Sequence, residues 1–436
     1  MKNKDKQAQG RRMFLIEGIM ASSEANTFMG NLLTAYALAV GSNARQIGIL
    51  STARNLAGFT QLLTNHVLQR IGSKRRLFYH TFGISRTIRV VVAFLPMIPL
   101  AFVSDNLAWW LIALMFMVSG GDAITMVLKK TWMSEITPPD IRGRYFGLRS
   151  LLSDFSGMLM GYFGGFYIDH FRELGREVFG FQSIFLFSTL IGYSTLFLVS
   201  RIPEISREPE RQGLKDFIKS FQLPFRNRPF LIWTIYDACY SFAVGFAGPF
   251  FTVYLLRELN LPLATVAIYT AIGEISSIAL SRWWGSLADK YGNLPILTVA
   301  CIGKSIFPAL WIFTSGINTL GAILWLGFVH SVRGFNSAQS ITTLNMTLGL
   351  SPEKDRPIYL ACESTVVNFL SAISPLLGGL LLGSMSVNHI ETSIFGWNHI
   401  LYPMHLLFLI SAILRGSASL ILIKVGLSMR KESSNA

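Results

Sequence analysis

The sequence predicts an all-α membrane protein in which twelve transmembrane helices form two pseudo-symmetric six-helix bundles. Only 14% of its 436 residues are charged and 51% are hydrophobic, whereas about 25% of the residues of a soluble protein are charged. A helix needs about 20 mostly apolar residues to cross a bilayer, and the sequence lacks the alternating ten-residue segments of a membrane β-barrel. Twelve segments have the required length and composition: residues 13–40, 46–68, 78–102, 107–128, 146–168, 181–200, 230–256, 262–284, 294–315, 319–345, 358–384 and 399–424.

The basic residues predict how these helices are oriented. The formal net charge is +14, and most of the Lys and Arg outside the apolar segments fall at the two termini and in alternate loops. The other loops hold only Arg45, Arg172, Arg176 and Arg257. Because Lys and Arg are retained on the cytoplasmic side, we expect a multi-pass protein of the cell (inner) membrane with both termini cytoplasmic. The positive charge then faces anionic membrane lipid, and we expect no nucleic acid as a partner.

The sequence also divides into two halves that resemble each other. A polar, proline-containing segment separates the sixth and seventh apolar segments, so we expect an N-terminal bundle (1–200), a cytoplasmic linker (201–229) and a C-terminal bundle (230–436). Duplicated six-helix units are a known design of secondary transporters. At an offset of 214 residues, seven positions are identical in the two halves: Pro138, Arg142, Tyr145, Ser150, Phe155, Gly164 and Gly165 match Pro352, Arg356, Tyr359, Ser364, Phe369, Gly378 and Gly379.

A loop motif lies between the eighth and ninth predicted helices. Residues 285–292 read Gly-Ser-Leu-Ala-Asp-Lys-Tyr-Gly, which resembles the Gly-x-Leu-Ala-Asp-Arg/Lys-x-Gly loop of the major facilitator superfamily. The equivalent loop between the second and third helices keeps Arg70 and Gly72 but has Gln69 where the family usually has Asp. The resemblance covers the whole chain, and it implies a transporter that opens alternately to the two sides of the membrane.

The same resemblance implies a gating role for these loops. Glycine permits tight turns and close helix contacts, and in this family the loop carboxylate bridges to the neighbouring bundle. Since Gln69 replaces one of the two carboxylates, Asp289 is the expected gate carboxylate, opposite Arg142. We expect the gating residues to be Arg70, Gly72, Arg142, Gly285, Asp289, Lys290, Gly292 and Arg356.

Ionisable residues inside the apolar segments are candidate functional residues, because a charge in the bilayer costs several kcal/mol unless it faces protein or water. Glu17, Arg86 and Asp237 lie within about two turns of predicted cytoplasmic helix ends, where they can reach water. The deeper polar residues, and those on the helices that line the cavity in the superfamily, give the expected substrate-binding or ion-coupling set: Glu24, Asn31, Arg54, Arg89, Asp122, Asp154, Glu274, His330, Arg333, Asn336, Glu363 and Asn368.

Within this set, one pairing would give a coupling mechanism. We hypothesise that Glu24 or Asp122, paired with Arg54 or Arg89, carries a coupling proton, since a buried carboxylate with a movable cationic partner can change its proton affinity between states. The alternative is a static ion pair that holds helices together.

These observations predict a secondary active transporter that moves a small solute by alternating access, with proton coupling as one option and symport or efflux undecided. The alternative is a non-transporting membrane receptor, an assembly factor or a lipid translocase on the same scaffold. We expect no enzyme activity. Gly303-Lys304-Ser305 looks like the end of a phosphate-binding loop, but Thr298 stands where the first glycine of that loop would be. The sequence also shows no metal-ligand cluster and no nucleophile triad. The expected partners are the solute, a proton and membrane lipid. We expect no cofactor and no metal, and a monomer.

Overall fold

The computed structural model describes residues 2–98, 106–138, 141–202, 222–315, 319–385, 389–394 and 397–435. The chain divides into two compact units. Unit 1 contains Met1–Glu210 and Leu255–Ala267, and unit 2 contains Arg211–Tyr254 and Ile268–Ala436. Most of the predicted linker, residues 203–221, lies outside the described residues.

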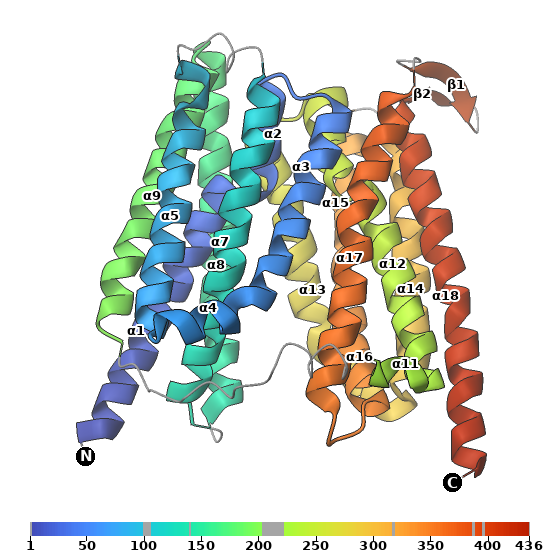
Figure 1. Ribbon diagram of the computed structural model, residues 1–436. Coiled ribbons are helices and arrows are strands. Elements are labelled where there is room, and N and C mark those ends of the chain that lie inside the picture. The colour runs from blue at the N-terminus through green and yellow to red at the C-terminus, as the bar shows by residue number, and fades with distance from the viewer. Residues whose placement is uncertain are drawn as a thin grey trace. The chain divides into compact units, whose positions relative to one another are not determined.

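Unit 1 is a bundle built from the first six predicted transmembrane segments (Figure 1). The first of these is divided at Met29, beyond which Gly30 has a left-handed φ of +59° that glycine adopts without steric cost. The second is divided by a 3-10 turn. The elements are α1 (Lys2–Phe28), α2 (Gly30–Ala39), α3 (Ala44–Ala57), η1 (Gly58–Leu63), α4 (Thr64–Ile71), α5 (Lys74–Phe94), η2 (Leu95–Met97), α7 (Leu107–Ile136), α8 (Arg142–Glu173) and α9 (Glu177–Ser200).

Unit 2 is built from the last six predicted segments, apart from Leu255–Ala267, which belongs to unit 1. It adds one short β-hairpin that the sequence did not predict. In the hairpin, Ile390 of the first strand lies opposite Leu401 of the second. The elements from the start of this half are α11 (Leu223–Arg226), α12 (Arg228–Val253), η4 (Tyr254–Glu258), α13 (Leu263–Tyr291), α14 (Asn293–Leu310), η5 (Trp311–Thr314), α15 (Thr319–Ser331), η6 (Val332–Gly334), α16 (Phe335–Leu350), α17 (Arg356–Gly383), β1 (Ile390–Ile394), β2 (Trp397–Leu401) and α18 (Pro403–Asn435).

The two units pack their helices in the same pattern. In unit 1, α1 packs against α8 and α9, and α5 packs against α7 and α9. In unit 2, α12 packs against α17 and α18, and α14 packs against α16 and α18. These are equivalent positions in the two halves, so the internal repeat in the sequence corresponds to a repeat of helix contacts.

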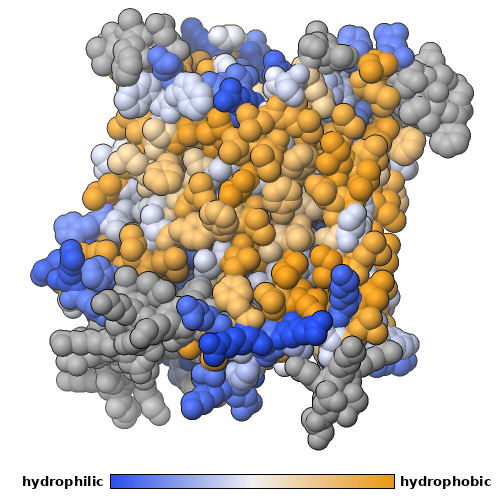
Figure 2. All heavy atoms as spheres, turned by 45° about the vertical axis from the view of Figure 1, so that its right-hand side comes forward, coloured by the Kyte–Doolittle hydropathy of each residue, from blue (hydrophilic) through white to orange (hydrophobic). Residues whose placement is uncertain are grey.

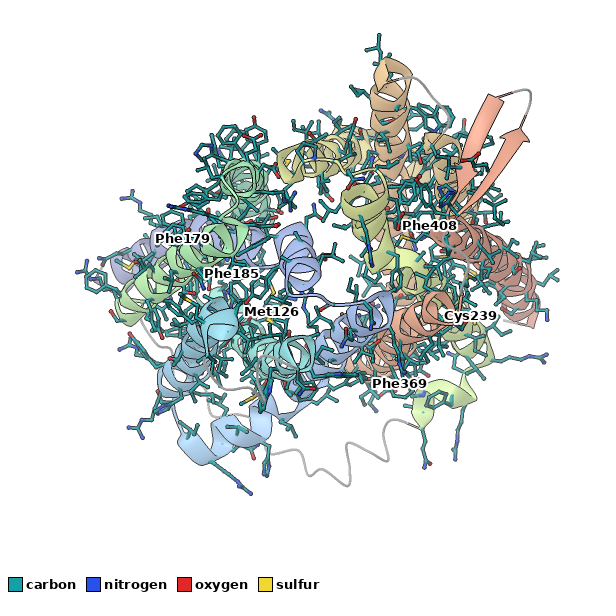
Figure 3. The ribbon with its side chains drawn as sticks, turned by 90° about the horizontal axis from the view of Figure 1, so that it is seen from above. Met126, Phe179, Phe185, Cys239, Phe369 and Phe408 are labelled. Atoms are coloured by element: carbon teal, nitrogen blue, oxygen red, sulfur yellow. The ribbon has the colours of Figure 1, made fainter. Side chains whose placement is uncertain are left out.

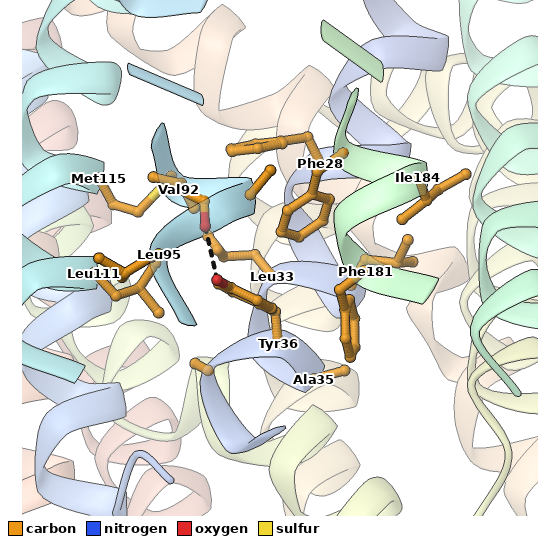
Figure 4. Packing of buried hydrophobic residues seen from close by; sticks show 14 of the residues in the cluster. Phe28, Leu33, Ala35, Tyr36, Val92, Leu95, Leu111, Met115, Phe181 and Ile184 are labelled. Atoms are coloured by element: carbon orange, nitrogen blue, oxygen red, sulfur yellow. Dashed lines mark hydrogen bonds between the residues drawn. The ribbon is translucent and has the colours of Figure 1, made fainter. Parts of the chain in front are cut away.

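Each unit has its own apolar core. In unit 1, buried residues of α1, α2, α3, α5, α7, α8 and α9 belong to one core with Tyr36, whose hydroxyl donates to the Val92 carbonyl at 2.7 Å (Figure 4). The ring of Phe185 lies 5.1 Å from that of Tyr36, edge to face. In unit 2, Trp233, Tyr236 and other buried residues of α12 form a comparable core with α14, α17 and α18. The cores hold the helices that carry the buried charges.

The outer helix faces are apolar. Phe179 of α9 is 54% exposed and lies on the outside of unit 1, whereas Phe185 on the same helix is fully buried (Figure 3). On the face shown in Figure 2, apolar side chains form a broad middle zone with polar side chains above and below it. Within the described residues, seven helices are long and apolar enough to cross a membrane individually. The remaining predicted spans are either divided, as in α1 and α2, or carry several charges, as in α5 and α8.

Candidate functional site

Unit 1 contains a buried charge cluster made of Glu24 on α1, Arg86 and Arg89 on α5, and Asp122 on α7. Arg89 bridges the two carboxylates: its Nη1 donates to Glu24 Oε1 at 2.7 Å, and its Nη2 donates to Asp122 Oδ2 at 2.6 Å. Arg86 donates to Glu24 Oε2 at 2.8 Å and also pairs with Asp122. Two guanidinium groups therefore hold two carboxylates, and the formal charges of the four residues balance.

The sequence of α5 explains why both arginines reach this cluster. Arg86 and Arg89 are three residues apart and so share one face of the helix. The Cζ of Arg86 lies 3.5 Å from the centre of the Phe82 ring, and that of Arg89 lies 4.6 Å from the centre of the Phe28 ring. Such cation–π contacts stabilise desolvated cations. The hydroxyl of Ser85 donates to Asp122 at 2.9 Å, so α5 supplies every one of these donors to Asp122.

The two carboxylates of the charge cluster differ in exposure. The Glu24 side chain is 1% exposed and that of Asp122 is 27% exposed. Arg54 of α3 lies within electrostatic range of Asp122 and Arg89. In the described part of the chain, the Nε of Arg54 has no hydrogen-bond partner and the residue makes no ion pair. Asp122 is therefore the more exposed of the two carboxylates, and a third cation lies near it.

Sequence reasoning identified three of these four residues. Glu24, Arg89 and Asp122 were expected functional residues, and the structure brings them together. Arg86 was expected to reach water near a helix end, and this prediction is wrong, because its side chain is 6% exposed inside the charge cluster. The three-residue spacing between Arg86 and Arg89 is the signal that could have assigned both to one site.

Two other predicted residues of unit 1 have different surroundings. Asp154 is exposed on α8 and accepts a hydrogen bond from Ser150, one turn earlier on the same helix, at 3.0 Å. Asn31 lies in the first turn of α2, beyond the break in the first predicted span. Asp154 thus lies outside the charge cluster, and Asn31 follows a break in the helix that carries Glu24.

Glu17 forms a second buried ion site in unit 1. It was expected to reach water at a helix end, but its side chain is fully buried. Lys129 of α7 donates to its Oε1 at 2.7 Å, and Arg149 of α8 donates to its Oε2 at 2.8 Å. The partners come from helices far apart in the sequence, which is why local position alone misled the prediction.

In unit 2, Glu363 on α17 is the most buried of the predicted carboxylates. The residue is 7% exposed. Its Oε1 accepts hydrogen bonds from Trp233 Nε1 at 2.6 Å and from Thr347 Oγ1 at 2.7 Å. Neither donor was predicted, because a tryptophan in an apolar segment gives no sign of its hydrogen-bond partner.

A second predicted pair in unit 2 is more accessible. Arg333 Nη2 lies 2.5 Å from Glu274 Oε1, with side chains that are 29% and 45% exposed. His330 is buried: its Nδ1 lies 2.8 Å from the Leu326 carbonyl oxygen, and its ring stacks on that of Tyr269 at a centroid distance of 5.2 Å. These contacts give His330 a packing role inside the bundle.

The remaining polar residues predicted in unit 2 are more dispersed. Asn336 is partly buried in the first turn of α16, and Asn368 is exposed on α17. Arg356, the first residue of α17, lies 3.9 Å from the carboxylate of Glu353, a side chain that is 93% exposed. An ion pair of this kind contributes little to stability.

The predicted gating residues of unit 1 lie at helix ends. Arg70 is exposed in the last turn of α4, and Gly72 ends that helix with a left-handed φ of +74°. Arg142 begins α8 and donates to the Ser134 carbonyl at 3.1 Å, near the end of α7. Arg142 therefore satisfies a carbonyl of the last helical turn of α7.

The loop motif of unit 2 has the same turn geometry. Gly292 has a φ of +88° between α13 and α14, and Asp289 and Lys290 are exposed in the last turn of α13. The close helix contact expected at Gly285 is not observed: among the described residues, no atom lies within 4 Å of the position a Cβ would take there. Gly292, by contrast, has a left-handed φ, which glycine adopts more readily than other residues.

Comparison with known proteins identifies the family. A sequence model of the Major Facilitator Superfamily matches residues 14–348. The chain belongs to the major facilitator superfamily. Members are non-enzymatic, multi-pass secondary transporters that bind small solutes, so the predicted family, the multi-pass character and the non-enzymatic class are confirmed. Among curated proteins, none is significantly similar in sequence.

Solved structures of this superfamily share the fold. A mutant of the nucleoside transporter NupG superimposes with a TM-score of 0.72 at 14% identity, over 96% of this chain and 99% of that one. A bacterial homologue of the iron transporter ferroportin gives 0.70 at 15% identity, over 96% and 98%. The xylose transporter XylE from E. coli gives 0.62 at 13% identity, over 96% and 99%. The predicted twelve-helix fold is thereby confirmed, and identities this low establish the fold alone.

Proposed function

We propose that this superfamily member is a proton-coupled transporter of a small polar solute, and that Asp122 carries the coupling proton. The observation that supports this most directly is that Asp122 shares both of its arginine partners with Glu24 while remaining partly exposed. A proton can reach Asp122 without opening the bundle core, and its arrival changes the charge balance of a buried site.

The proposed coupling step follows from that sharing. Protonation removes the charge of Asp122 and hence most of its attraction for Arg86 and Arg89, whereas Glu24 still holds both guanidinium groups. The charge cluster, balanced before, then carries one net positive charge. An unbalanced charge in a bundle core is costly, and this cost favours a rearrangement that depends on the proton.

The solute is proposed to be polar because Arg54 adds a third cation beside the charge cluster. Arg54 makes no ion pair with the described residues, and it lies within electrostatic range of Asp122. When Asp122 is neutral, Arg54 and the released donors of Arg86 and Arg89 form a cationic surface on unit 1. Such a surface is suited to an anionic or strongly hydrogen-bond-accepting group of the solute.

The loops, the domain division and the orientation complete the proposal. The side chains of the loop residues Asp289 and Lys290 are exposed and do not belong to the bundle core. A gating loop requires this, because its side chains exchange binding partners as the transporter changes state. We assign bundles to residues 1–200 and 230–436, with a cytoplasmic linker at 201–229. The proposed protein is a monomer of the cell membrane with both termini cytoplasmic.

The test is gradient-driven accumulation in proteoliposomes, using a solute first identified by its stabilisation of the purified protein. The wild type is expected to accumulate the solute only when a pH gradient is imposed. Asp122→Asn is expected to lose this accumulation while still exchanging solute across the membrane. The matched control is Glu173→Gln, an exposed carboxylate at the end of α8 in the same unit, which is expected to behave as the wild type. Full accumulation by Asp122→Asn would contradict the proposal and favour a static ion pair.

A further inference from the structure

Unit 2 contains a pocket of about 400 Å³ between α12, α16 and α17. Its wall includes two carboxylates, Asp237 of α12 and Glu363 of α17, together with hydroxyl and amide groups of α16. Ligand pockets for small molecules begin at about this size and combine a few directed polar groups with apolar walls. Leu344 and Leu360 supply the apolar part here.

Asp237 is an unusual carboxylate for this protein. It is 9% exposed and lines the pocket, and among the described residues it makes no hydrogen bond and no ion pair. The buried carboxylates of unit 1 are different, since Glu17 and Glu24 each bind two cationic side chains. Sequence position suggested that Asp237 reaches water at a helix end, and the structure places it in this pocket instead.

Two further residues of the pocket wall carry oxygens without a hydrogen-bond donor among the described residues. The hydroxyl of Thr343 is buried and has no hydrogen-bond partner in the described part of the chain. Glu363 receives its two hydrogen bonds, from Trp233 and Thr347, on Oε1 alone. Asp237, Thr343 and Glu363 all line the pocket, and each carries at least one oxygen that accepts no hydrogen bond from the described residues.

The basic residues packed nearest to the pocket are bound by groups other than its two carboxylates. The ammonium group of Lys304 on α14 donates to Gln339 and lies 5.7 Å from the centre of the Tyr240 ring. Arg415 of α18 donates to the Lys304 carbonyl at 3.2 Å. Lys304 lies within electrostatic range of Asp237 but forms no ion pair with it. Neither basic residue lines the pocket.

We infer that this pocket binds a small organic cation that carries an ammonium group. An ammonium group donates up to three hydrogen bonds, and the two carboxylates of the wall, Asp237 and Glu363, supply acceptors and negative charge for it, with Thr343 beside them. The leucines of the wall fit an alkyl chain. A bare metal ion is a poorer match, because the described residues contain no group of three or more His, Cys, Asp or Glu placed to hold one. The inference does not require proton coupling at Asp122, since all of these residues belong to unit 2.

The test is ligand-induced stabilisation of the purified full-length protein, with 1,4-butanediammonium as the probe. A ligand that binds the native state raises the unfolding midpoint by mass action. The neutral isostere 1,4-butanediol and sodium chloride at the same ionic strength are the comparisons. The diammonium is expected to raise the midpoint and the other two are not. The inference is overturned if the diammonium leaves the unfolding midpoint unchanged, or if the diol or sodium chloride raises it equally. This comparison needs only the wild-type protein.

Substitutions then locate the effect. Asp237→Asn and Glu363→Gln are each expected to weaken apparent binding of the diammonium at least about tenfold, which corresponds to about 1.4 kcal/mol. The matched control is Glu353→Gln in the same unit, whose side chain is 93% exposed, and it is expected to bind as the wild type. Undiminished binding by both pocket variants overturns the assignment. Because this readout is binding rather than flux, it can fail or succeed independently of the coupling proposed for unit 1.

Discussion

Gly192 of α9 faces the carboxylate of Glu24 so closely that a Cβ at this position would lie 2.6 Å from Glu24 Oε1. That distance is shorter than any normal carbon–oxygen contact, and the Cγ of Arg86 would be only 3.1 Å away. The absence of a side chain at residue 192 is thus part of what allows a carboxylate and two guanidinium groups to fit between the helices.

Gly192→Ala is therefore expected to lower the stability of the protein. Added atoms in a well-packed core cost about 1–3 kcal/mol, and here they push against a buried ion pair. The measurement is the unfolding midpoint of the purified protein in detergent. The control is Gly83→Ala on α5, where no neighbouring atom lies within 4 Å of the new Cβ. Alanine there favours the helix by up to about 1 kcal/mol, so equal destabilisation by the two variants would contradict the role of Gly192.

Glu24→Gln is expected to be more damaging than the glycine substitution. It leaves Arg86 and Arg89 with a single carboxylate in a site where Glu24 is 1% exposed. Breaking a buried ion pair by removing one partner costs about 3–5 kcal/mol. Chemical denaturation in mixed micelles should show a free energy of unfolding lower by about this amount, and a loss below about 1 kcal/mol would mean that Glu24 is not needed to balance the arginines.

Glu274→Gln is expected to have a small effect on stability. The Arg333–Glu274 pair is short, but its side chains are 29% and 45% exposed. Exposed ion pairs contribute about 0–1 kcal/mol. The same denaturation experiment should give a change within this range. A change as large as that of Glu24→Gln would show that this pair is shielded from solvent in the membrane.

The proposed orientation can be tested by cysteine labelling in whole cells. In a background that lacks Cys239, Cys301 and Cys362, Arg45→Cys is expected to react with a membrane-impermeant maleimide. Lys354→Cys is expected to react only after the membrane is permeabilised, because basic loops are retained in the cytoplasm. The reverse labelling pattern would contradict the orientation.

The fold could be predicted almost entirely from the sequence, because length and hydropathy decide which segments can cross a bilayer. The twelve predicted segments follow from local hydropathy. The internal repeat and the loop motif can be read directly from the order of the residues. The helix break after Met29 depends on the left-handed conformation of Gly30. A glycine inside an apolar segment does not by itself predict that conformation. The hairpin of β1 and β2 was not predicted: β1 lies between two predicted segments, and the end of β2 overlaps the segment predicted at 399–424.

The candidate site could be predicted only in part, for a physical reason. A charge in an apolar segment is recognisable, which is why Glu24, Arg89 and Asp122 were identified. Its partner is chosen by helix packing over long sequence distances, as Glu17 and Arg149 illustrate. The sequence therefore shows which residues need a partner, and the structure shows that Asp237 has none among the described residues.

The most direct test of the central claim is proton movement itself. A pH-sensitive dye trapped inside proteoliposomes would report the internal pH while the stabilising solute moves down its own gradient. The wild type is expected to change the internal pH as the solute moves. Asp122→Asn is expected to move the solute with no such change, because the carboxylate that takes up and releases the proton beside Arg86 and Arg89 is gone. A solute-dependent pH change of the same size in Asp122→Asn would contradict the account.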